Sequence, residues 1–574
     1  MRIRRIDVSN FRGIREGSLE LMQGSRLACL IGAGDSTKST LLEAISWALW
    51  PSYSLSVSDA DFTDSDVSQP IEISVTFDEF PPELADDRAF GMYLRGSVDA
   101  EDDPRDGGDV LLTVRLSVDD SLEPDWSVVK NSKEPKKINA KQRALFGVHA
   151  LGGDCAKDLS WGRQSVLHRY ANSKGATEDA RVQALRKLAE VDSFQELDKA
   201  NPGIAAAAEK AGVKLDKDSL GNRIIASPFS ISGNISLTEG GVPLRQRGLG
   251  SQRLISMGLG IGAVDDGSIL LVDEVESGLE PYRLRSLVST ARKLVEKTGQ
   301  CIFTTHSPVA LTELKAEELY AVSSSMGKTV VFPFSEATET KDDVQRLLRR
   351  SSEAFLARRI VVCEGKTEVG FLKAIDERLD GGRMALAGSF YAEAGGGSQT
   401  FPLARLFRSA GYDACIFMDS DNNDDNAAKL DIRNEGVDVF DWDDGKCLEA
   451  QVFADVPDDV VRDLILLAED LNSRGRVECG LGDQSLDFDE LIAEGATYDA
   501  DTRESLGKAA TWKKADGGKD KDRSWFKNIE KGTRMGEVVL GCRDRLGGKK
   551  LLKTIEDIET WVVGEIREGA DGER

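Results

Sequence analysis

The second half of this 574-residue sequence places carboxylates directly behind two short apolar segments. Glu364 follows the segment 359–363, and Glu368 lies four residues further on, where a helix is expected to begin. Asp419 and Asp421 follow the second segment, and their spacing of two puts them on the same side of the chain. Because parallel strands end at a common edge of their sheet, we expect these carboxylates to converge. Carboxylates that repel one another in one cleft favour divalent cations, so the pattern predicts a metal site; the alternative is a set of polar turns.

A second candidate site lies in the first part of the chain, where a glycine-rich loop follows an apolar run. The loop 32–39 nearly matches G-x-x-x-x-G-K-[ST], with Thr37 in place of the second glycine. Backbone N–H groups at the start of the following helix can surround phosphates, the lysine can reach the β- and γ-phosphates, and the next hydroxyl can bind Mg²⁺. The alternative is an ordinary glycine-rich turn. The residues expected to bind the nucleotide and its ion are Gly32, Gly34, Lys38, Ser39 and Thr40.

Three segments further along the chain agree with a nucleotide site. The apolar run 269–272 ends in Asp273 and Glu274, which could hold the water shell of Mg²⁺ and polarise an attacking water. His306, one of three histidines, closely follows the apolar run 300–304, where a sensor of the γ-phosphate would lie, although a lone histidine is more often structural. A Gly-Ser turn that opens a helix offers a second phosphate-binding end, made of Gly250, Ser251 and Gln252.

The hydrophobic pattern predicts the strands and helices that must position these residues. Two parallel βαβ series are expected, the first over 268–308 and the second from 358 through the two aspartates to a further strand at 437–442. The polar passage 335–357 between them predicts a linker. Further segments alternate like half-buried strands or recur with helical spacing. The strands are expected at 71–80, 110–118 and 224–237, and the helical insertion at 150–214.

Composition and charge exclude several classes of protein. Hydrophobic residues make up 40% and charged residues 30% of the chain, which is typical of a globular enzyme rather than a disordered or collagenous chain. No apolar run suits a membrane span or a signal peptide, so a cytoplasmic protein is expected, and eight cysteines without a C-x-x-C pair argue against structural zinc. The net charge of −25 argues against non-specific binding of nucleic acid. Segment 508–553, however, holds 14 Lys and Arg against 6 Asp and Glu, and could contact a polyanion or simply form a solvated surface.

The motifs of the first part together resemble the ABC-type ATPases of the recombination and SMC group. The resemblance rests on segments 10–13, 32–39, 248–252 and 277–280 together with Asp273, Glu274 and His306. It implies binding of ATP with Mg²⁺. In that family the signature turn of one subunit completes the ATP site of the other, so the resemblance also implies a dimer that forms with nucleotide.

The carboxylate pattern resembles the Toprim domain of topoisomerases, primases and a class of nucleases, in which E-G-x-x-E is followed by D-x-D. Segment 445–449 looks like the additional S-x-x-E motif of OLD-family (overcoming lysogenization defect) nucleases, with Lys446 in place of the serine. The resemblance makes Glu449 a metal ligand. That family also carries an essential lysine near its carboxyl end, for which Lys527 is our first choice and Lys531 the second; either could instead attract the phosphate backbone generally.

An ABC-type head followed by a Toprim domain is the layout of OLD-family endonucleases, and Gabija-type anti-phage nuclease subunits share it. The resemblance implies an α/β fold, with an SMC- or RecF-like ATPase head, a helical dimerisation insertion and a Toprim domain built on a parallel sheet. The expected boundaries are 1–149 and 215–340 for the two parts of the ATPase, 150–214 for the insertion, and 358–574 for the Toprim domain with its basic segment.

The resemblance implies a nuclease that depends on Mg²⁺ or Mn²⁺ and cleaves double-stranded DNA. Two cations would clamp the scissile phosphate, one held by Glu364, Asp419 and Asp421 and the other by Glu368 and Glu449. Lys527 or Lys531 would stabilise the charge of the transition state. A homodimer or larger homo-oligomer, a helicase-like partner and a role in anti-phage defence or DNA repair are further expectations.

Three other functions remain open on the sequence alone. The chain could be a DNA-repair or recombination ATPase whose Toprim domain does not cut. It could be a Toprim primase or topoisomerase, although no tyrosine lies in a context typical of a topoisomerase nucleophile. It could also be a nucleotide sensor without enzymatic activity that assembles and recruits a partner.

Overall fold

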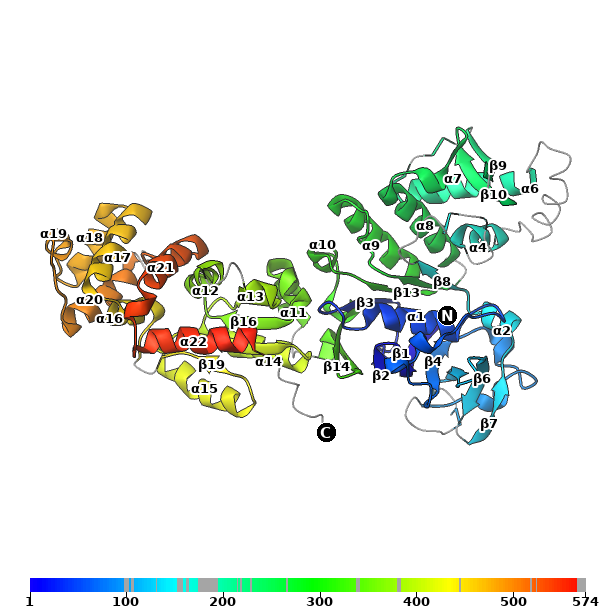
Figure 1. Ribbon diagram of the computed structural model, residues 1–574, viewed down its shortest axis with the longest axis horizontal. Coiled ribbons are helices and arrows are strands. Elements are labelled where there is room, and N and C mark those ends of the chain that lie inside the picture. Colours follow the sequence, from blue (N-terminus) through cyan, green and yellow to red (C-terminus); the bar gives the residue numbers. More distant parts are fainter. Residues whose placement is uncertain are drawn as a thin grey trace. The chain divides into compact units, whose positions relative to one another are not determined.

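The computed structural model divides the chain into two units, Met1–Leu356 and Ala357–Arg574, each of which is described by itself (Figure 1). The residues described are 1–97, 103–104, 108–130, 132–151, 158–159, 161, 165–173, 195–213, 215–216, 219–227, 230–264, 267–336, 341–378, 383–442, 445–516, 519–522 and 524–564.

The first unit is built on a sheet of twelve strands in the order β7-β6-β5-β4-β1-β2-β15-β14-β3-β13-β12-β8. The first six strands of this order, from β7 through β6, β5, β4 and β1 to β2, pair in antiparallel fashion. By contrast, β14, β3, β13, β12 and β8 run parallel to one another. The antiparallel strands are β1 (Arg2–Phe11), β2 (Ile14–Glu20), β4 (Ile71–Glu79), β5 (Leu112–Val118), β6 (Pro124–Lys130) and β7 (Lys133–Lys137). The others are β3 (Leu27–Ile31), β8 (Val148–Leu151), β12 (Ile269–Val272), β13 (Gln300–Thr304), β14 (Leu319–Ser325) and β15 (Lys328–Pro333).

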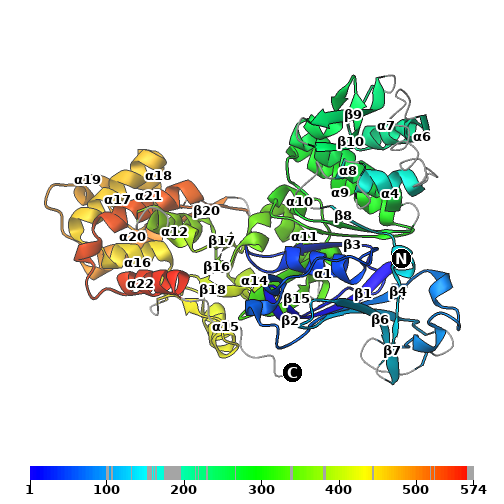
Figure 2. The same ribbon diagram turned by 45° about the vertical axis from the view of Figure 1, so that its right-hand side comes forward.

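Every residue of β3, β12 and β13 is buried, as expected of parallel strands that are covered on both faces. Helix α1 (Lys38–Ala48) lies on one side of these strands, and α8 (Leu249–Val264) and α9 (Pro281–Val295) lie on the other (Figures 1 and 2). Helix α9 begins with a proline at its first position and buries Leu284, Leu287, Val288, Ala291 and Val295 at helical spacing. The predicted βαβ unit and the β-rich lobe are confirmed.

The predicted insertion contains short helices where it is described. They are α4 (Val166–Ser173), α6 (Gln195–Asp198) and α7 (Asn201–Lys210), while 152–157, 160, 162–164, 174–194 and 214 lie outside the described residues. The strand-like alternation at 224–237 corresponds to β9 (Leu220–Ser227) and β10 (Ser230–Glu239), which form a small antiparallel sheet with β11 (Val242–Pro243). A role in dimerisation stays a prediction.

The prediction of a linker over 335–357 is wrong for its described part. The 3₁₀ helix η8 (Phe334–Glu336) is followed by α11 (Lys341–Arg350) and η9 (Ser352–Leu356), all of which belong to the first unit. All their apolar residues except the half-buried Leu356 are buried, and the ring centroids of Phe334 and Phe355 lie 5.1 Å apart. The polar residues of α11 whose side chains are described, such as Arg346, Arg349 and Arg350, lie on its solvent side, so the first unit extends to Leu356 rather than to residue 340.

The second unit contains a four-stranded parallel sheet in the order β17-β16-β18-β19. Its strands are β16 (Arg359–Cys363), β17 (Ser389–Glu393), β18 (Asp413–Phe417) and β19 (Val439–Phe440), with helices α12 (Lys366–Arg378), α13 (Arg383–Leu386), α14 (Gly397–Ser409) and α15 (Asn423–Asn434). The helices α16 (Leu448–Asp455), α17 (Asp458–Leu471), α18 (Arg474–Asp483), α19 (Phe488–Leu491) and α20 (Ala500–Ala510) form a helical layer that the sequence pattern did not predict. The chain ends in the hairpin β20 (Lys513–Asp516) and β21 (Lys519–Asp522), followed by α21 (Ile529–Gly541), η10 (Arg543–Arg545) and α22 (Lys550–Val563).

One continuous hydrophobic core joins the parallel sheet to the helical layer. It includes Val361 of β16, Phe417 of β18, Leu464 of α17 and Leu481 of α18, all of them buried. The sheet and the helical layer therefore form one packed body. Of the helices described in the chain, none combines the length and the hydropathy that a membrane crossing requires.

Glycines allow α12 and α21 to cross at very short distance. A Cβ atom on Gly532 would lie 2.5 Å from the backbone oxygen of Thr367, and one on Gly370 would overlap the backbone oxygen of Ile529. The crossing ties the first turn of α12 to the segment that enters α21. Glu368 and Lys527, which the sequence singles out, lie on these two segments.

Replacing Gly532 with alanine should therefore destabilise the second unit by about 1–3 kcal/mol, because neither backbone can move aside cheaply. Differential scanning calorimetry should show its melting temperature lowered by roughly 2–4 °C per kcal/mol. Gly475→Ala, at a helical glycine where an added Cβ would have no atom within 4 Å, is the matched control and should be neutral. Equal melting temperatures for the two variants would contradict the tight crossing.

Candidate functional site

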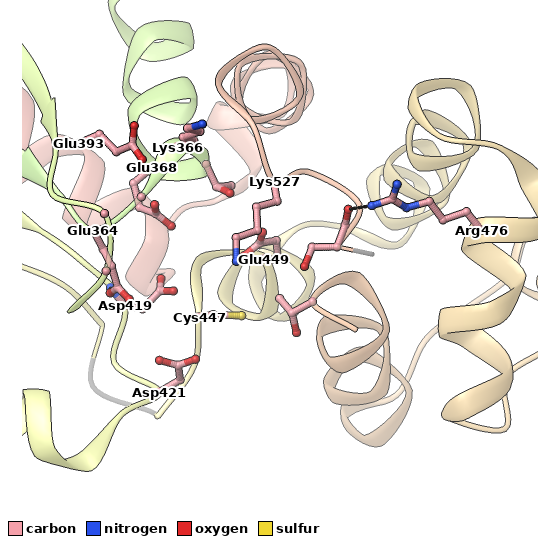
Figure 3. A pocket seen from close by; sticks show the side chains of 16 residues that line it. Glu364, Lys366, Glu368, Glu393, Asp419, Asp421, Cys447, Glu449, Arg476 and Lys527 are labelled. Carbon is pink, nitrogen blue, oxygen red and sulfur yellow. Dashed lines mark hydrogen bonds between the residues drawn. The ribbon is translucent and has the colours of Figure 1, made fainter. Parts of the chain in front are cut away.

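The carboxylates singled out in the second half of the sequence line a single cavity of about 560 Å³ (Figure 3). They reach it from four places: the ends of β16 and β18 and the first turns of α12 and α16. The acidic residues of the cavity are Glu364, Glu368, Glu393, Asp419, Asp421 and Glu449. Five of these six were predicted from the sequence. Glu393 was missed because the short strand β17 that carries it was not recognised.

Backbone hydrogen bonds hold the ends of β16 and β18 together. The N–H of Glu364 donates to the oxygen of Phe417 at 3.3 Å, and the N–H of Asp419 donates to Oε2 of Glu364 at 3.3 Å. The N–H of Leu448, at the start of α16, donates to Oδ1 of Asp419 at 2.8 Å. The Asp419 carboxylate thus lies at the amino-terminal end of a helix, where the backbone dipoles favour negative charge.

A buried lysine supports the turn that carries the two aspartates. Nζ of Lys429, only 2% exposed, donates to the backbone oxygen of Asp419 at 2.6 Å and to Oγ of Ser420 at 3.1 Å. It also forms an ion pair with Asp441 at 2.9 Å. Lys429 therefore holds the backbone of the turn that carries Asp419 and Asp421, a role that the sequence pattern did not reveal.

Burial and mutual repulsion raise the pKa values of the cavity carboxyls. Burial, reinforced by Glu449, raises the pKa of Glu368 to about 8. Burial and the neighbouring carboxylates, Glu368 first, raise the pKa of Asp419 well above its usual value. The pKa of Glu364 and that of Glu449 are also raised by burial, and Lys527 opposes the second of these shifts. Holding these groups ionised without a cation is unfavourable.

The chemistry of these donors fits Mg²⁺ or Mn²⁺, which prefer carboxylate oxygens. Among the described residues, no three acidic, histidine or cysteine side chains are already close enough to hold one ion together. Side chains that repel one another are expected to separate until a cation attracts them, so the cavity supplies the ligands while their rotamers must adjust.

The structure distinguishes between the two candidate lysines. Lys527 lines the cavity, and Figure 3 shows its side chain beside Glu449. Nζ of Lys531 instead donates to Oδ1 of Asn472 at 2.6 Å, and Lys531 is not among the lining residues. Lys446, which replaces the serine of the S-x-x-E motif, contributes its backbone oxygen to the N–H of Ser420 at 3.0 Å.

The glycine-rich loop of the first unit leads from β3 into α1, as the sequence predicted. Nζ of Lys38 donates to the oxygens of Gly32 and Ala33 and to Oγ of Ser36, at 3.1, 2.7 and 2.9 Å. Burial lowers the pKa of Lys38 to about 8, and the nearby Asp273 carboxylate opposes this shift.

The backbone of the loop keeps the shape of the motif although Thr37 replaces its glycine. Thr37 adopts a φ of 64°, so this non-glycine residue takes the left-handed conformation that the motif's glycine would favour. Gly34 is exposed and Thr40 half-buried at this end of α1.

The ends of β12 and β13 meet the loop. Oγ of Ser39 and Oγ1 of Thr304 donate to Oδ1 of Asp273 at 2.8 and 2.7 Å, and Oγ of Ser277 donates to Oε2 of Glu274 at 2.9 Å. The structure thus places Ser39 and Asp273 together. His306, two residues after the end of β13, is exposed, and its backbone N–H donates to Oε1 of Glu276 at 2.6 Å. Glu276, which also accepts from Thr305 at 2.6 Å, was missed by sequence reasoning.

The Gly-Ser turn opens α8, as expected, and packs against the segment after Glu274. A Cβ on Gly250 would overlap the oxygen of Gly278, so glycine is required at this contact. Nε2 of Gln252 donates to the backbone oxygens of Arg245 and Arg247 at 3.0 and 2.6 Å, which turns this side chain towards its own loop. Ser251 is half-buried in the first turn, and Arg253, missed from the sequence, donates to the backbone oxygens of Asp273 and Glu274.

Several protein families and one named relative resemble parts of this chain. A family model described as "Overcoming lysogenization defect protein-like, TOPRIM domain" matches residues 355–421. Two models described as AAA domains match residues 5–199 and 169–312, the second with the addition "putative AbiEii toxin, Type IV TA system". An OLD nuclease of Thermus scotoductus is 24% identical over 399 residues, which cover 63% of this chain and 71% of that protein. The predicted resemblance to the OLD family is confirmed.

Head domains of SMC proteins with solved structures also align with part of this chain. The SMC head domain from Thermotoga maritima aligns with 58% of this chain and 99% of its own, at 14% identity and a TM-score of 0.31. A Pyrococcus furiosus Smc head domain, bound to the C-terminal domain of ScpA, aligns with 61% of this chain and 98% of its own, at 13% identity and a TM-score of 0.36.

Replacing Glu368 with glutamine should stabilise the OLD-like Toprim unit in the presence of a chelator. The pKa of Glu368 is about 8 in the folded protein and 4.5 without its surroundings. The folded state therefore binds the extra proton between these values, and stability falls as pH rises from about 4.5 to 8. The variant should lose the part of this pH-dependent fall in stability that Glu368 causes. It should therefore melt several degrees higher than the wild type at pH 8, at roughly 2–4 °C per kcal/mol.

Melting curves from pH 5 to 8 in EDTA measure this effect. Glu377→Gln, an exposed position on the same helix, is the control and should follow the wild type. A Glu368→Gln profile parallel to that of the wild type at every pH would show that this carboxyl carries no such penalty.

Proposed function

We propose that this protein is a metal-dependent DNA endonuclease coupled to an ABC-type ATPase. The observation that carries the proposal is the cavity in which five predicted carboxylates from four chain segments meet Lys527. The similarity of the chain to an OLD nuclease also supports the proposal. A role in anti-phage defence or DNA repair and a homodimeric assembly belong to the same proposal.

The residues of the cavity have different roles in the proposed hydrolysis. Glu364, Asp419 and Asp421 would hold one divalent cation, and Glu368 and Glu449 would hold the other. When bound, such cations lower the pKa of water and stabilise the leaving oxygen of a phosphodiester. Lys527 donates to the phosphate oxygens and stabilises the charge that develops on them. The helix end at α16 and Lys429 keep Asp419 in place throughout.

The first unit binds ATP at the glycine-rich loop. Lys38 exchanges its loop carbonyls for phosphate oxygens, and Ser39 and Asp273 hold Mg²⁺ with its water shell. Glu274 orients the attacking water, and His306 senses the γ-phosphate. The turn at Ser251 completes the site of a second copy of the chain, so that nucleotide controls assembly and thereby DNA cleavage.

Removing the charge of Asp419 should abolish cleavage of supercoiled plasmid in Mn²⁺ or Mg²⁺. Both Asp419→Ala and Asp419→Asn are expected to lose on the order of 100-fold or more. The asparagine retains Oδ1, which accepts from Leu448, so its loss of activity would report the charge rather than the helix contact. Asp431→Ala, at an exposed position on α15, should cleave like the wild type. A wild-type protein that binds DNA but never nicks it would instead indicate a repair ATPase with a non-cutting Toprim domain.

Cleavage should depend on ATP concentration through Lys38. Plasmid cleavage titrated with ATP should change in one direction for the wild type and stay flat for Lys38→Ala, because the loop then lacks its phosphate ligand. Lys141→Ala on α2 (Ala140–Ala144), also in the first unit but exposed, should retain the wild-type response. A wild type that ignores ATP at all concentrations would exclude coupling.

A further inference from the structure

The cavity of the Toprim unit has a wall that carries no carboxylate. This wall is formed by the helical layer and by the segment that enters α21. The residues that line the cavity there are Arg476, Thr511, Ser524 and Lys527.

Arg476 is held at this wall by the packing of α18. Its Nη2 donates to the backbone oxygen of Ser524 at 3.1 Å, and Ser524 is 4% exposed. The next residue, Val477, is fully buried in the core that also contains Val361 of β16. The guanidinium is therefore fixed relative to the carboxylates by one continuous core rather than by a flexible loop.

Arg476 lies apart from the carboxylates at the ends of the strands, whereas Lys366 lies among them and Lys527 lies beside Glu449. In Figure 3 the carboxylates at the ends of β16 and β18 lie on one side, Lys527 lies in the middle and Arg476 lies on the far side. Arg476 and Lys527 both line this wall, so an anion bound between them would face two cations.

We propose that Arg476 binds the phosphate that neighbours the scissile phosphate on the cleaved DNA strand. This inference rests on the proposed nuclease function. Lys527, beside Glu449, serves the scissile phosphate; Arg476, on the far side of Lys527, is placed for the next phosphate along the strand. The planar fork of a guanidinium matches two phosphate oxygens at once, which a lysine cannot do. The helical layer thereby sets the register of the strand over the carboxylates.

DNA in which one phosphate at a time is replaced by an uncharged methylphosphonate tests this assignment. An end-labelled DNA duplex, with its cleavage position mapped for the wild type, carries one methylphosphonate at the scissile position or at one of the two phosphates on either side. For the wild type, neutralising one neighbouring phosphate should raise KM by about 10- to 100-fold with little change in kcat. Arg476→Ala should show the same rise on unmodified DNA and no further rise with that methylphosphonate. Arg476→Lys should recover only part of the loss.

Two controls separate positioning from folding and from the nuclease proposal. Arg474→Ala, on the same helix but bound to Glu478 and Asp489 at 2.7 Å, should behave like the wild type. DNA affinity, measured by fluorescence anisotropy in an Asp419→Asn background with EDTA, should fall by a similar factor for Arg476→Ala. Identical methylphosphonate profiles for Arg476→Ala and the wild type would overturn the assignment while leaving the nuclease intact. A wild type that neither binds nor cuts DNA would overturn both.

Discussion

Burying Glu368, Asp419 and Glu449 close to one another costs folding free energy, because each charge loses water and faces the others. The Toprim unit bears this cost through contacts that do not neutralise the carboxylates. The N–H of Leu448 and the dipole of α16 favour the charge of Asp419, and Lys429 binds the backbone behind it rather than its carboxylate. These carboxylates therefore line the cavity as charged groups that a divalent cation can attract.

The same constraint explains the tight crossing of α12 and α21. A carboxylate cluster is useful only if its counter-charges are held at a fixed distance, since a flexible lysine would pair with the nearest acid. Gly370 and Gly532 let the two backbones meet, so that Glu368 at the start of α12 and Lys527 just before α21 are fixed relative to each other. The hydrophobic core that joins the sheet to α17 and α18 extends this rigidity to Arg476.

Much of the fold could be predicted from the sequence because its signals are local. Continuous apolar runs predict the buried parallel strands β12, β13, β16 and β18, and the residues that follow them predict which side chains reach the sheet edge. The strand β17 is only half-buried and has no such run, so it was missed together with Glu393. Arg476 and Lys429 gave no signal because their roles depend on contacts between distant segments, to Ser524 and to Asp441 respectively. Polar residues on the exposed face of α11 produced the incorrect linker.

A net charge of −25 leaves only local charge to attract DNA. A backbone donor at the start of α16 stabilises Asp419 on the acidic side of the cavity. Helix α18 and the segment that enters α21 hold Arg476 on the far side. A phosphodiester strand with its metal ions has the complementary pattern, because the cations meet the carboxylates and the unneutralised phosphates meet Arg476 and Lys527. In the proposed nuclease, a few fixed groups of the cavity would attract the DNA while the net negative charge of the chain repels it. Salt would screen both effects, so the register of the strand within the cavity would matter more than long-range steering.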